Sequence, residues 1–349
     1  MTFSSVFLFY RGPQRECKNE FSNLVPVGLF NILYYLKKNG INAKLYNLSH
    51  FSEKKLYGFL NNLKPEISFI SSFYGNHWEA IKLSELIKKN YPNSVTIIGG
   101  PISVIGEDIL RKFRNIDYII YGEGETASLK LVKFLHEKIT NIKEIENLIY
   151  WENDKIKKNP PSFYNNIDEF FYIPSQIKNN VNFVQDENFQ VLITSRGCPF
   201  SCSFCSSPVL WGRKVRFHSI ENIIRYVKDL IENLGLNYFS IRDDNFLANK
   251  KRVVEFSKEI IKRATQKIDI KKEIIKIFKL LFTTRRVLTA AVLTIFLVFC
   301  ITLGGIQYKK NQELNKEKII IENIGLLENM ELLERLDFYK EINKKGVNL

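Results

Sequence analysis

Short apolar runs alternate with segments of helical periodicity along the first 140 residues of the chain. The runs that predict strands lie at 6–10, 42–48, 67–71, 95–98 and 117–121. The segments that predict helices lie at 26–38, 52–63, 76–90, 108–113 and 126–137. This alternation predicts parallel strands with helices on both faces of a sheet. We therefore expect residues 1–140 to form an α/β domain with a five-stranded, doubly wound parallel sheet, which binds ligands at the carboxyl ends of its strands.

The pattern changes after this first domain. Residues 141–186 predict a connector, because prolines interrupt the segment and only a small hairpin around Asn153 and Asp154 stands out. Residues 187–264 return to the alternation and predict two strand–helix units. Strands are expected at 190–195 and 238–242, and helices at 219–234 and 249–263.

An apolar segment at 287–308 contains no charged residue and is long enough to cross a bilayer, which needs about 20 apolar residues. It follows a basic juxtamembrane segment at 265–286 and precedes a tail of helical periodicity at 309–349. A buried helix of a large domain is the alternative interpretation, and the charged flanks weaken it. Because the stronger basic side precedes the segment, the positive-inside rule predicts a single-pass membrane protein with residues 1–286 in the cytoplasm.

The chain of 349 residues has a net charge of +14, which raises the question of nucleic-acid binding. About half of this excess lies between residues 262 and 286, directly before the apolar segment. The other lysines are interspersed with acidic and polar residues, as on solvated surfaces. We therefore expect no nucleic-acid partner. The hydrophobic content of 45% supports folded cores, and the length allows about two domains.

Three of the five cysteines lie close together, at Cys198, Cys202 and Cys205, in a Cys-x3-Cys-x2-Cys pattern. Three thiolates leave one position of a four-ligand metal centre open, where a substrate or cofactor can bind. A zinc site completed by His218 is the alternative interpretation. Disulfides are disfavoured, because three clustered thiols cannot all pair with one another.

Two neighbours of the cysteines fit the same interpretation, because Gly197 allows a tight turn and Phe204 gives an apolar position that limits solvent access. The stretch resembles the cluster loop of the radical S-adenosylmethionine (SAM) enzymes, Cys-x3-Cys-x-aromatic-Cys. The resemblance implies that the three cysteines hold three irons of a [4Fe-4S] cluster, that the fourth iron binds SAM, and that Phe204 lies near the adenine. It also implies a reductase or other electron donor, because one electron from the cluster cleaves SAM to methionine and a 5′-deoxyadenosyl radical.

Glycines occur at two expected strand ends, with Gly99-Gly100 after the fourth strand and Gly122-Glu123-Gly124 after the fifth. Ordinary strand-to-helix turns explain such glycines equally well. In order and spacing, however, the first domain resembles the cobalamin-binding domain that precedes the SAM core in one class of radical SAM enzymes. This resemblance implies that these residues bind the cofactor. The sequence lacks the Asp-x-His-x-x-Gly loop of many such domains, so cobalamin would bind without a protein histidine ligand, or the domain would serve as a scaffold.

Two acidic residues, Asp243 and Asp244, follow the second strand of the 187–264 region. Carboxylates at the carboxyl end of a strand are well placed to bind a cation or to accept hydrogen bonds from the amino or ribose groups of SAM. An Asp-Asp-x-Phe run at this position is common in the family that the cysteines resemble. A cap for the following helix is the alternative interpretation.

The radical SAM resemblance also implies a partial barrel of about six βα units, or about 180 residues at about 30 residues a unit. Residues 187–264 hold two units, which leaves an open sheet edge and favours a homodimer or a partner that completes the barrel. The leading hypothesis is a radical SAM enzyme that cleaves SAM reductively and acts on an unidentified small molecule. The alternatives are a non-catalytic, truncated or chimeric membrane-anchored remnant and a cluster-based redox sensor.

Overall fold

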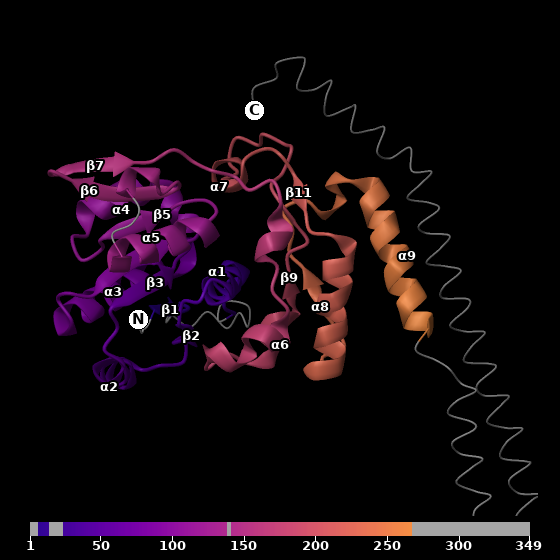
Figure 1. Cartoon of the computed structure of the whole chain (residues 1–349), viewed down its shortest axis with the longest axis horizontal. Coiled ribbons are helices and arrows are strands. Elements are labelled where there is room, and N and C mark those ends of the chain that lie inside the picture. The colour runs from indigo at the N-terminus through magenta and orange to yellow at the C-terminus, as the bar shows by residue number, and fades with distance from the viewer. Residues whose placement is uncertain (1–5, 14–23, 138–140, 267–349) are drawn as a thin grey trace, which may run out of the picture. The chain divides into compact units, whose positions relative to one another are not determined.

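The computed structural model of the chain describes residues 6–13, 24–137 and 141–266 (Figure 1). The chain divides into two compact units, residues 1–253 and 254–349, and the second is described only as far as residue 266. The sheet, the cavities and the cysteine loop all belong to the first unit.

Five parallel strands form the centre of the first unit. They are β1 (Val6–Tyr10), β2 (Ala43–Asn47), β3 (Ile67–Ser71), β4 (Val95–Gly99) and β5 (Tyr118–Ile120). Their order across the sheet is β5-β4-β3-β1-β2. This is the order of flavodoxin-like sheets, in which ligands bind beside the point between β1 and β3 where the winding reverses. The doubly wound parallel sheet expected from the sequence is confirmed.

Helices cover both faces of this sheet. On one face lie α2 (Glu53–Leu63), α3 (His77–Asn90) and α4 (Gly106–Lys112), whose apolar residues form a core with Phe7, Phe9 and Ile98 of the strands. Because side chains alternate along a strand, Val6 and Leu8 face the other side, and both are fully buried. The helices α1 (Val27–Lys38) and α5 (Glu125–Glu137), which contact each other, cover that side.

Two helix starts follow directly from the sequence. The hydroxyl of Ser52 accepts a hydrogen bond from the backbone N–H of Lys55 at the start of α2. The hydroxyl of Ser219 accepts one from the N–H of Asn222 at the start of α8 (Ile220–Asn233). In each case a serine side chain satisfies a backbone donor that has no partner within the helix.

A hairpin extends the sheet beyond β5. Its strands, β6 (Leu148–Glu152) and β7 (Lys155–Lys158), are antiparallel, and β6 pairs with β5. Asn153 and Asp154 have φ angles of 48° and 58°, which is the left-handed pair that a two-residue hairpin turn requires. The sequence predicted the hairpin but not its place in the sheet. At the other edge, β8 (Val181–Asn182) pairs with β2, which gives eight strands in all.

The region that carries the cysteines contains two short strand pairs. The parallel pair β9 (Val191–Leu192) and β12 (Ser240–Ile241) belongs to the two predicted strand–helix units. The antiparallel pair β10 (Ser195–Arg196) and β11 (Arg216–Phe217) was not expected. The helices of this region are α7 (Ser207–Trp211), α8 and α9 (Lys250–Gln266). The connector contains the short helix α6 (Pro174–Ile177). Both predicted strand–helix units are present, but their strands are shorter than predicted.

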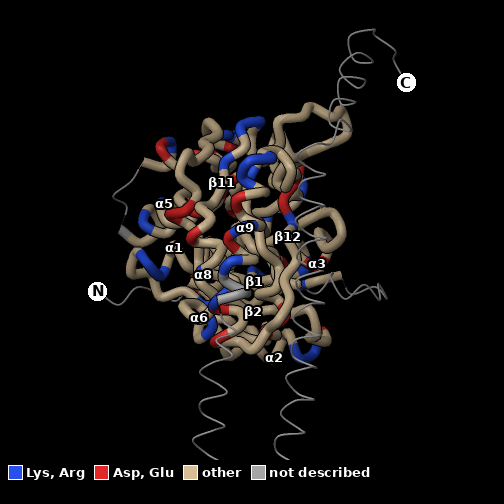
Figure 2. The backbone as a smooth tube through the Cα atoms, turned by 90° about the vertical axis from the view of Figure 1, so that its right-hand side faces the viewer, with Lys and Arg blue, Asp and Glu red and all other residues tan. Residues whose placement is uncertain are grey.

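The predicted membrane span at 287–308 and the tail at 309–349 lie outside the described residues, as does most of the basic segment. Among the helices that the structure does describe, none combines the length and the apolar character needed to cross a bilayer. The membrane placement therefore stays a prediction. In Figure 2, the Lys and Arg positions of the described chain are scattered among Asp and Glu positions, as expected for solvated surfaces.

Candidate functional site

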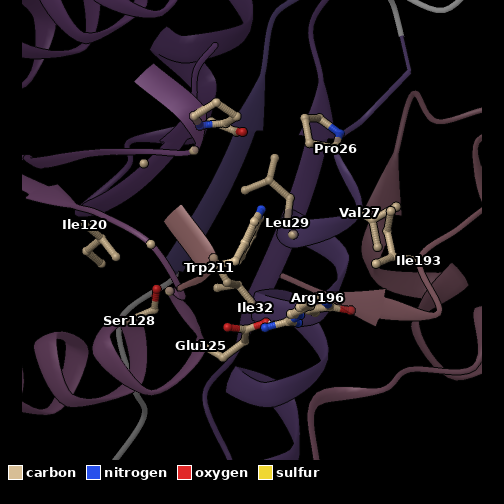
Figure 3. A pocket seen from close by; sticks show the side chains of 18 of the residues that line it. Pro26, Val27, Leu29, Ile32, Ile120, Glu125, Ser128, Ile193, Arg196 and Trp211 are labelled. Atoms are coloured by element: carbon tan, nitrogen blue, oxygen red, sulfur yellow. The ribbon is translucent and has the colours of Figure 1, made fainter. Parts of the chain in front are cut away.

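A cavity of about 320 Å³ lies at the carboxyl ends of β3, β4 and β5. Its walls come from the strand ends, from α1 and α5, and from the cysteine-bearing region (Figure 3). Most of its lining is apolar, and includes Leu29, Ile32, Ile70, Ile97, Ile120 and Ile193. The position is the one that the topology of a doubly wound sheet predicts for a ligand.

The four predicted glycines all line this cavity. Gly100 has a φ angle of 89°, and a Cβ atom there would lie 2.6 Å from the carbonyl oxygen of Ser72. Gly122 has a φ angle of 69°, and a Cβ atom would lie 3.0 Å from the carbonyl oxygen of Leu210. The backbone turn alone therefore requires these two glycines. Gly99 and Gly124 have ordinary backbone angles, and the absence of a side chain at both leaves room in the cavity.

Two polar atoms at one end of the cavity have no hydrogen-bond partner among the described residues. They are Oε2 of Glu125 and Oγ of Ser128, on residues that are 3% and 0% exposed. Both residues line the cavity, one helical turn apart on α5 (Figure 3). Because an unsatisfied buried acceptor is costly, these atoms suit a ligand that carries N–H or O–H groups. The sequence predictions missed both residues, although their spacing of three on a helix was a usable signal.

Glu123 does not serve as the predicted cofactor contact. Its Oε1 lies 3.0 Å from Nη1 of Arg196, and its Oε2 lies 2.7 Å from Nη1 of Arg216. Oε2 also accepts a hydrogen bond from the backbone N–H of Tyr164. Both carboxylate oxygens are thus occupied by protein donors, and Glu123 is 1% exposed. The residue joins the first domain to the cysteine-bearing region instead of facing a ligand.

Arg196 is the centre of this buried charge network. Its Nη2 lies 2.5 Å from Oε1 of Glu125, in addition to its contact with Glu123. Burial alone would lower the pKa of Arg196, but the two carboxylates raise it above its usual value, so the guanidinium stays charged. Arg196 ends β10, two residues before the first cysteine, and the network therefore fixes the strand that leads into the cysteine loop.

The cysteine loop connects β10 to α7. Cys198 is half-buried, Cys202 and Cys205 are exposed, and all three are free thiols. Within the described residues, no three His, Cys, Asp or Glu side chains are arranged to hold a metal ion, so the sulfur atoms are not gathered into one ligand set. Three thiols on a single loop match the donors that a [4Fe-4S] cluster takes. Metal binding commonly organises such a loop around the metal.

The neighbours of the cysteines behave in opposite ways. Gly197 has a φ angle of 92°, and a Cβ atom would lie 2.7 Å from the carbonyl oxygen of Lys214, so the tight turn is confirmed. Phe204 does not limit solvent access to the cysteine loop as expected, because it is 90% exposed. Its predicted place near the adenine of SAM stays a prediction.

His218 does not complete a zinc site with the cysteines. Its Nδ1 lies 3.1 Å from a carboxylate oxygen of Asp168, and its ring packs against Phe171. Burial lowers the pKa of His218, which favours the neutral ring. The residue belongs to the packing of β11 against the connector, and these contacts disfavour the alternative of a Cys3His zinc site.

The two aspartates after β12 have different roles. Asp243 accepts hydrogen bonds from the backbone N–H and hydroxyl of Thr194, at 2.6 and 2.5 Å, and from the hydroxyl of Ser195. It therefore ties the end of β12 to the segment before the cysteine loop. Asp244 lines the cavity and accepts a hydrogen bond from Ser207, the first residue of α7. Neither caps α9, because Asn249 accepts the hydrogen bond at that helix start.

Comparison with known proteins identifies two domains. A family profile described as "B12 binding domain" matches residues 21–132, and one described as "Radical SAM superfamily" matches residues 192–294. An uncharacterised methyltransferase of Pyrococcus horikoshii is 33% identical over 205 residues, which are 58% of this chain and 44% of that protein. The hopanoid C-3 methylase of Methylococcus capsulatus is 28% identical over 232 residues, which are 65% of this chain and 44% of the methylase. The chain thus spans less than half the length of these relatives.

Solved structures show the same fold. The cobalamin-dependent SAM radical enzyme OxsB, with aqua-cobalamin and SAM bound, is 20% identical with a TM-score of 0.62, and the match covers 74% of this chain and 37% of OxsB. The radical SAM methyltransferase TsrM from Kitasatospora setae, with cobalamin and a [4Fe-4S] cluster bound, is 16% identical with a TM-score of 0.62, over 77% of this chain and 52% of TsrM. The chain therefore combines a B12-binding domain with a radical SAM domain that follows it.

Proposed function

We propose that this chain binds cobalamin, SAM and a [4Fe-4S] cluster and takes part in cobalamin-dependent radical SAM methyl transfer to a small molecule. The observation that carries the proposal is the shared cavity, which is lined both by the B12-binding domain and by the radical SAM domain. Gly100 and Glu125 represent the first domain in its wall, and Ile193 and Asp244 represent the second. A ligand in this cavity would therefore touch both domains at once.

The cavity suits part of a cobalamin molecule. Its apolar walls and its glycine-lined end fit a large, flat group, and the corrin ring carries amide side chains that supply the N–H donors missing at Glu125 and Ser128. No histidine lines the cavity. Cobalamin binding without a protein histidine ligand is therefore part of the proposal.

The cluster would be held by Cys198, Cys202 and Cys205. A bound cluster would supply the electron that cleaves SAM, and bound cobalamin would supply a carrier for the methyl group. Asp244 is the best described candidate for contact with SAM, since it lines the cavity and is linked through Ser207 to the end of the cysteine loop. Asp243 is a positioning residue, because its oxygens are taken up by Thr194 and Ser195.

The protein's own contribution is to hold the cysteine loop against the B12-binding domain. The ion pairs of Arg196 with Glu123 and Glu125 fix the strand before the loop. The indole of Trp211 and the side chain of Ile32 line the cavity between the two domains and would shield a bound ligand from water. Such shielding would favour the controlled use of a reactive radical over side reactions with solvent.

The partner predictions follow from the strand arrangement. Among the described strands, β9 and β12 pair only with each other. A homodimer or a second protein that completes the barrel at this pair is therefore part of the proposal. The proposal also includes an electron donor for the cluster. It further includes a membrane-anchored chain with residues 1–286 in the cytoplasm. A shared cavity lined by both domains favours a cofactor-binding enzyme over a non-catalytic remnant or a redox sensor.

Anaerobic reconstitution of the full chain with iron and sulfide tests the proposal. We expect about four irons per chain, lost in Cys202→Ala, because a [4Fe-4S] cluster needs its thiolates. Hydroxocobalamin should bind with a shifted visible spectrum, and reduction with SAM should yield 5′-deoxyadenosine. A reconstituted chain that holds iron but forms no 5′-deoxyadenosine would refute catalysis by this chain alone. A chain that binds neither iron nor cobalamin would refute the whole proposal.

A further inference from the structure

Arg11 is a buried cation without an ion-pair partner among the described residues. It follows the last residue of β1 and is 5% exposed. Its Nε has no hydrogen-bond partner among the described residues, and the acidic groups that act on its charge are Glu53 and Glu79. Because a buried charge without a partner is costly, this arrangement suits an anion that the described residues do not provide.

The side chain of Arg11 lines a cavity of about 500 Å³ on the α2–α3 side of the sheet. This cavity shares no lining residue with the one between the two domains. The other residues that line it are Glu53, Lys54, Leu56, Tyr57, Lys82, Glu85, Leu86 and Lys89. The pocket is thus formed by the start of α2 and the second half of α3, with Arg11 beside them.

The charges of this pocket do not balance. Arg11, Lys54, Lys82 and Lys89 carry four positive charges, against the negative charges of Glu53 and Glu85, so two positive charges are in excess. The lysines are exposed at the rim, whereas Arg11 is buried. Burial lowers the pKa of Arg11, and the more distant Glu53 and Glu79 only partly oppose this effect. Glu79 lies outside the lining but also acts on Arg11, so the excess is one to two positive charges, which a phosphate anion compensates.

The backbone around Arg11 is held from both sides. The side-chain amide of Asn76 donates a hydrogen bond of 2.9 Å to the carbonyl oxygen of Arg11. The backbone N–H of Gly12 donates one of 2.9 Å to the hydroxyl of Ser49. Asn76 follows β3 and Ser49 follows β2, so the ends of three strands fix the point from which the arginine projects. The guanidinium is therefore presented by a rigid base, as a binding group requires.

We propose that this pocket binds a phosphate group, held by the guanidinium of Arg11 with the rim lysines Lys54, Lys82 and Lys89 around it. A guanidinium offers two parallel N–H donors that match two phosphate oxygens, and the lysines add charge without fixed direction. The phosphate is either free inorganic phosphate or the phosphoester of a small molecule. The pocket goes beyond the proposed function, because no residue of the cofactor cavity takes part in it.

Binding to the full chain tests the proposal, without iron or cobalamin. Inorganic phosphate and ribose 5-phosphate are titrated by calorimetry and by thermal unfolding, against sodium chloride of equal ionic strength. We expect saturable binding and a rise in Tm with phosphate that chloride does not reproduce. Tighter binding of ribose 5-phosphate would identify a phosphoester as the ligand, and equal or weaker binding would identify free phosphate.

Two sets of variants make the test specific. Arg11→Gln should weaken phosphate binding at least tenfold, whereas Arg111→Gln, which removes an exposed arginine paired with Asp108, should leave it unchanged. If Arg11→Gln does not fold, the exposed pair Lys82→Gln and Lys89→Gln should still weaken binding about threefold. Coincident phosphate and chloride curves, or wild-type affinity in a folded Arg11→Gln protein, would overturn the proposal.

Discussion

Nη2 of Arg196 lies 2.5 Å from Oε1 of Glu125, and this contact joins the strand before the cysteine loop to the first turn of α5. Both side chains are nearly inaccessible to solvent. The two residues are far apart in sequence and belong to different domains. The contact helps to hold the B12-binding domain and the radical SAM region up to residue 253 in one compact unit in spite of the connector between them.

The ion pairs of this network should contribute strongly to stability. Glu123→Ala removes the ion-pair partner of the buried Arg216 and one of the two carboxylates that pair with the buried Arg196, which keeps Glu125. We expect the free energy of unfolding to fall by about 3–5 kcal/mol in chemical denaturation. Glu146→Ala, which breaks an exposed pair with Lys130, should cost less than about 1 kcal/mol. Equal effects of the two substitutions would show that the network is not a major stabilising element.

A turn residue of the cavity should be intolerant of a side chain. Gly100→Ala places a Cβ atom 2.6 Å from a carbonyl oxygen at a φ angle of 89°. We expect a loss of at least about 2 kcal/mol of stability and weaker hydroxocobalamin binding. Gly40→Ala is the matched control, because Gly40 has a φ angle of 80° but open space around it. If both variants lose the same stability, the backbone angle alone is responsible and the cavity wall plays no part.

The two adjacent aspartates should separate stability from ligand binding. Asp243→Asn weakens three hydrogen bonds to Thr194 and Ser195, so we expect a loss of about 1.5–3 kcal/mol in unfolding free energy. Asp244→Asn should cost less than about 1 kcal/mol but weaken SAM binding to the reconstituted protein. Calorimetric titration with SAM checks the second effect, and unchanged SAM affinity in a folded Asp244→Asn protein would exclude this residue from the site.

Acidification should destabilise the chain in two steps. Burial lowers the pKa of His218 below its unfolded value of about 6.5, so the unfolded chain binds protons first and stability falls as the pH drops below about 6.5. Burial alone would raise the pKa of Asp168, but hydrogen bonds from His218 and Ser219 hold it below its usual value. Its contribution is therefore present above about pH 3.9 and is lost on further acidification.

Denaturation of His218→Gln at several pH values checks the first of these steps. The variant should lose less stability than the wild type between about pH 7 and 5, since glutamine does not titrate. His50→Gln is the control, because His50 is exposed. A His218→Gln protein with the full wild-type pH dependence would contradict the expected role of the buried ring.

The local pattern of the sequence predicted the local structure well. Alternating runs gave the five parallel strands, and Asn153 with Asp154 gave the hairpin turn, because such preferences act over a few residues. The pairing of β6 with β5 and of β10 with β11 was missed, since both depend on segments brought together only by the fold.

The candidate site was predicted only in part, for the same reason. The four glycines line the cavity as expected, but Glu123 was assigned to a cofactor although it pairs with Arg196 and Arg216. Nothing in the sequence around Glu123 shows that two arginines far along the chain will face it. Glu125 and Ser128 were missed although they lie three residues apart on a predicted helix, because that spacing does not show that their side-chain atoms stay unpaired in the fold.

The hairpin at the end of the sheet has a consequence for assembly. Its outer strand, β7, exposes Lys155, Lys157 and Lys158. Two copies that met edge to edge at β7 would place like charges opposite one another, and the opposite edge, β8, offers only two residues for pairing. Both ends of the large sheet thus resist aggregation. Association through β9 and β12 could then complete a barrel without competition from growth of the larger sheet into fibres.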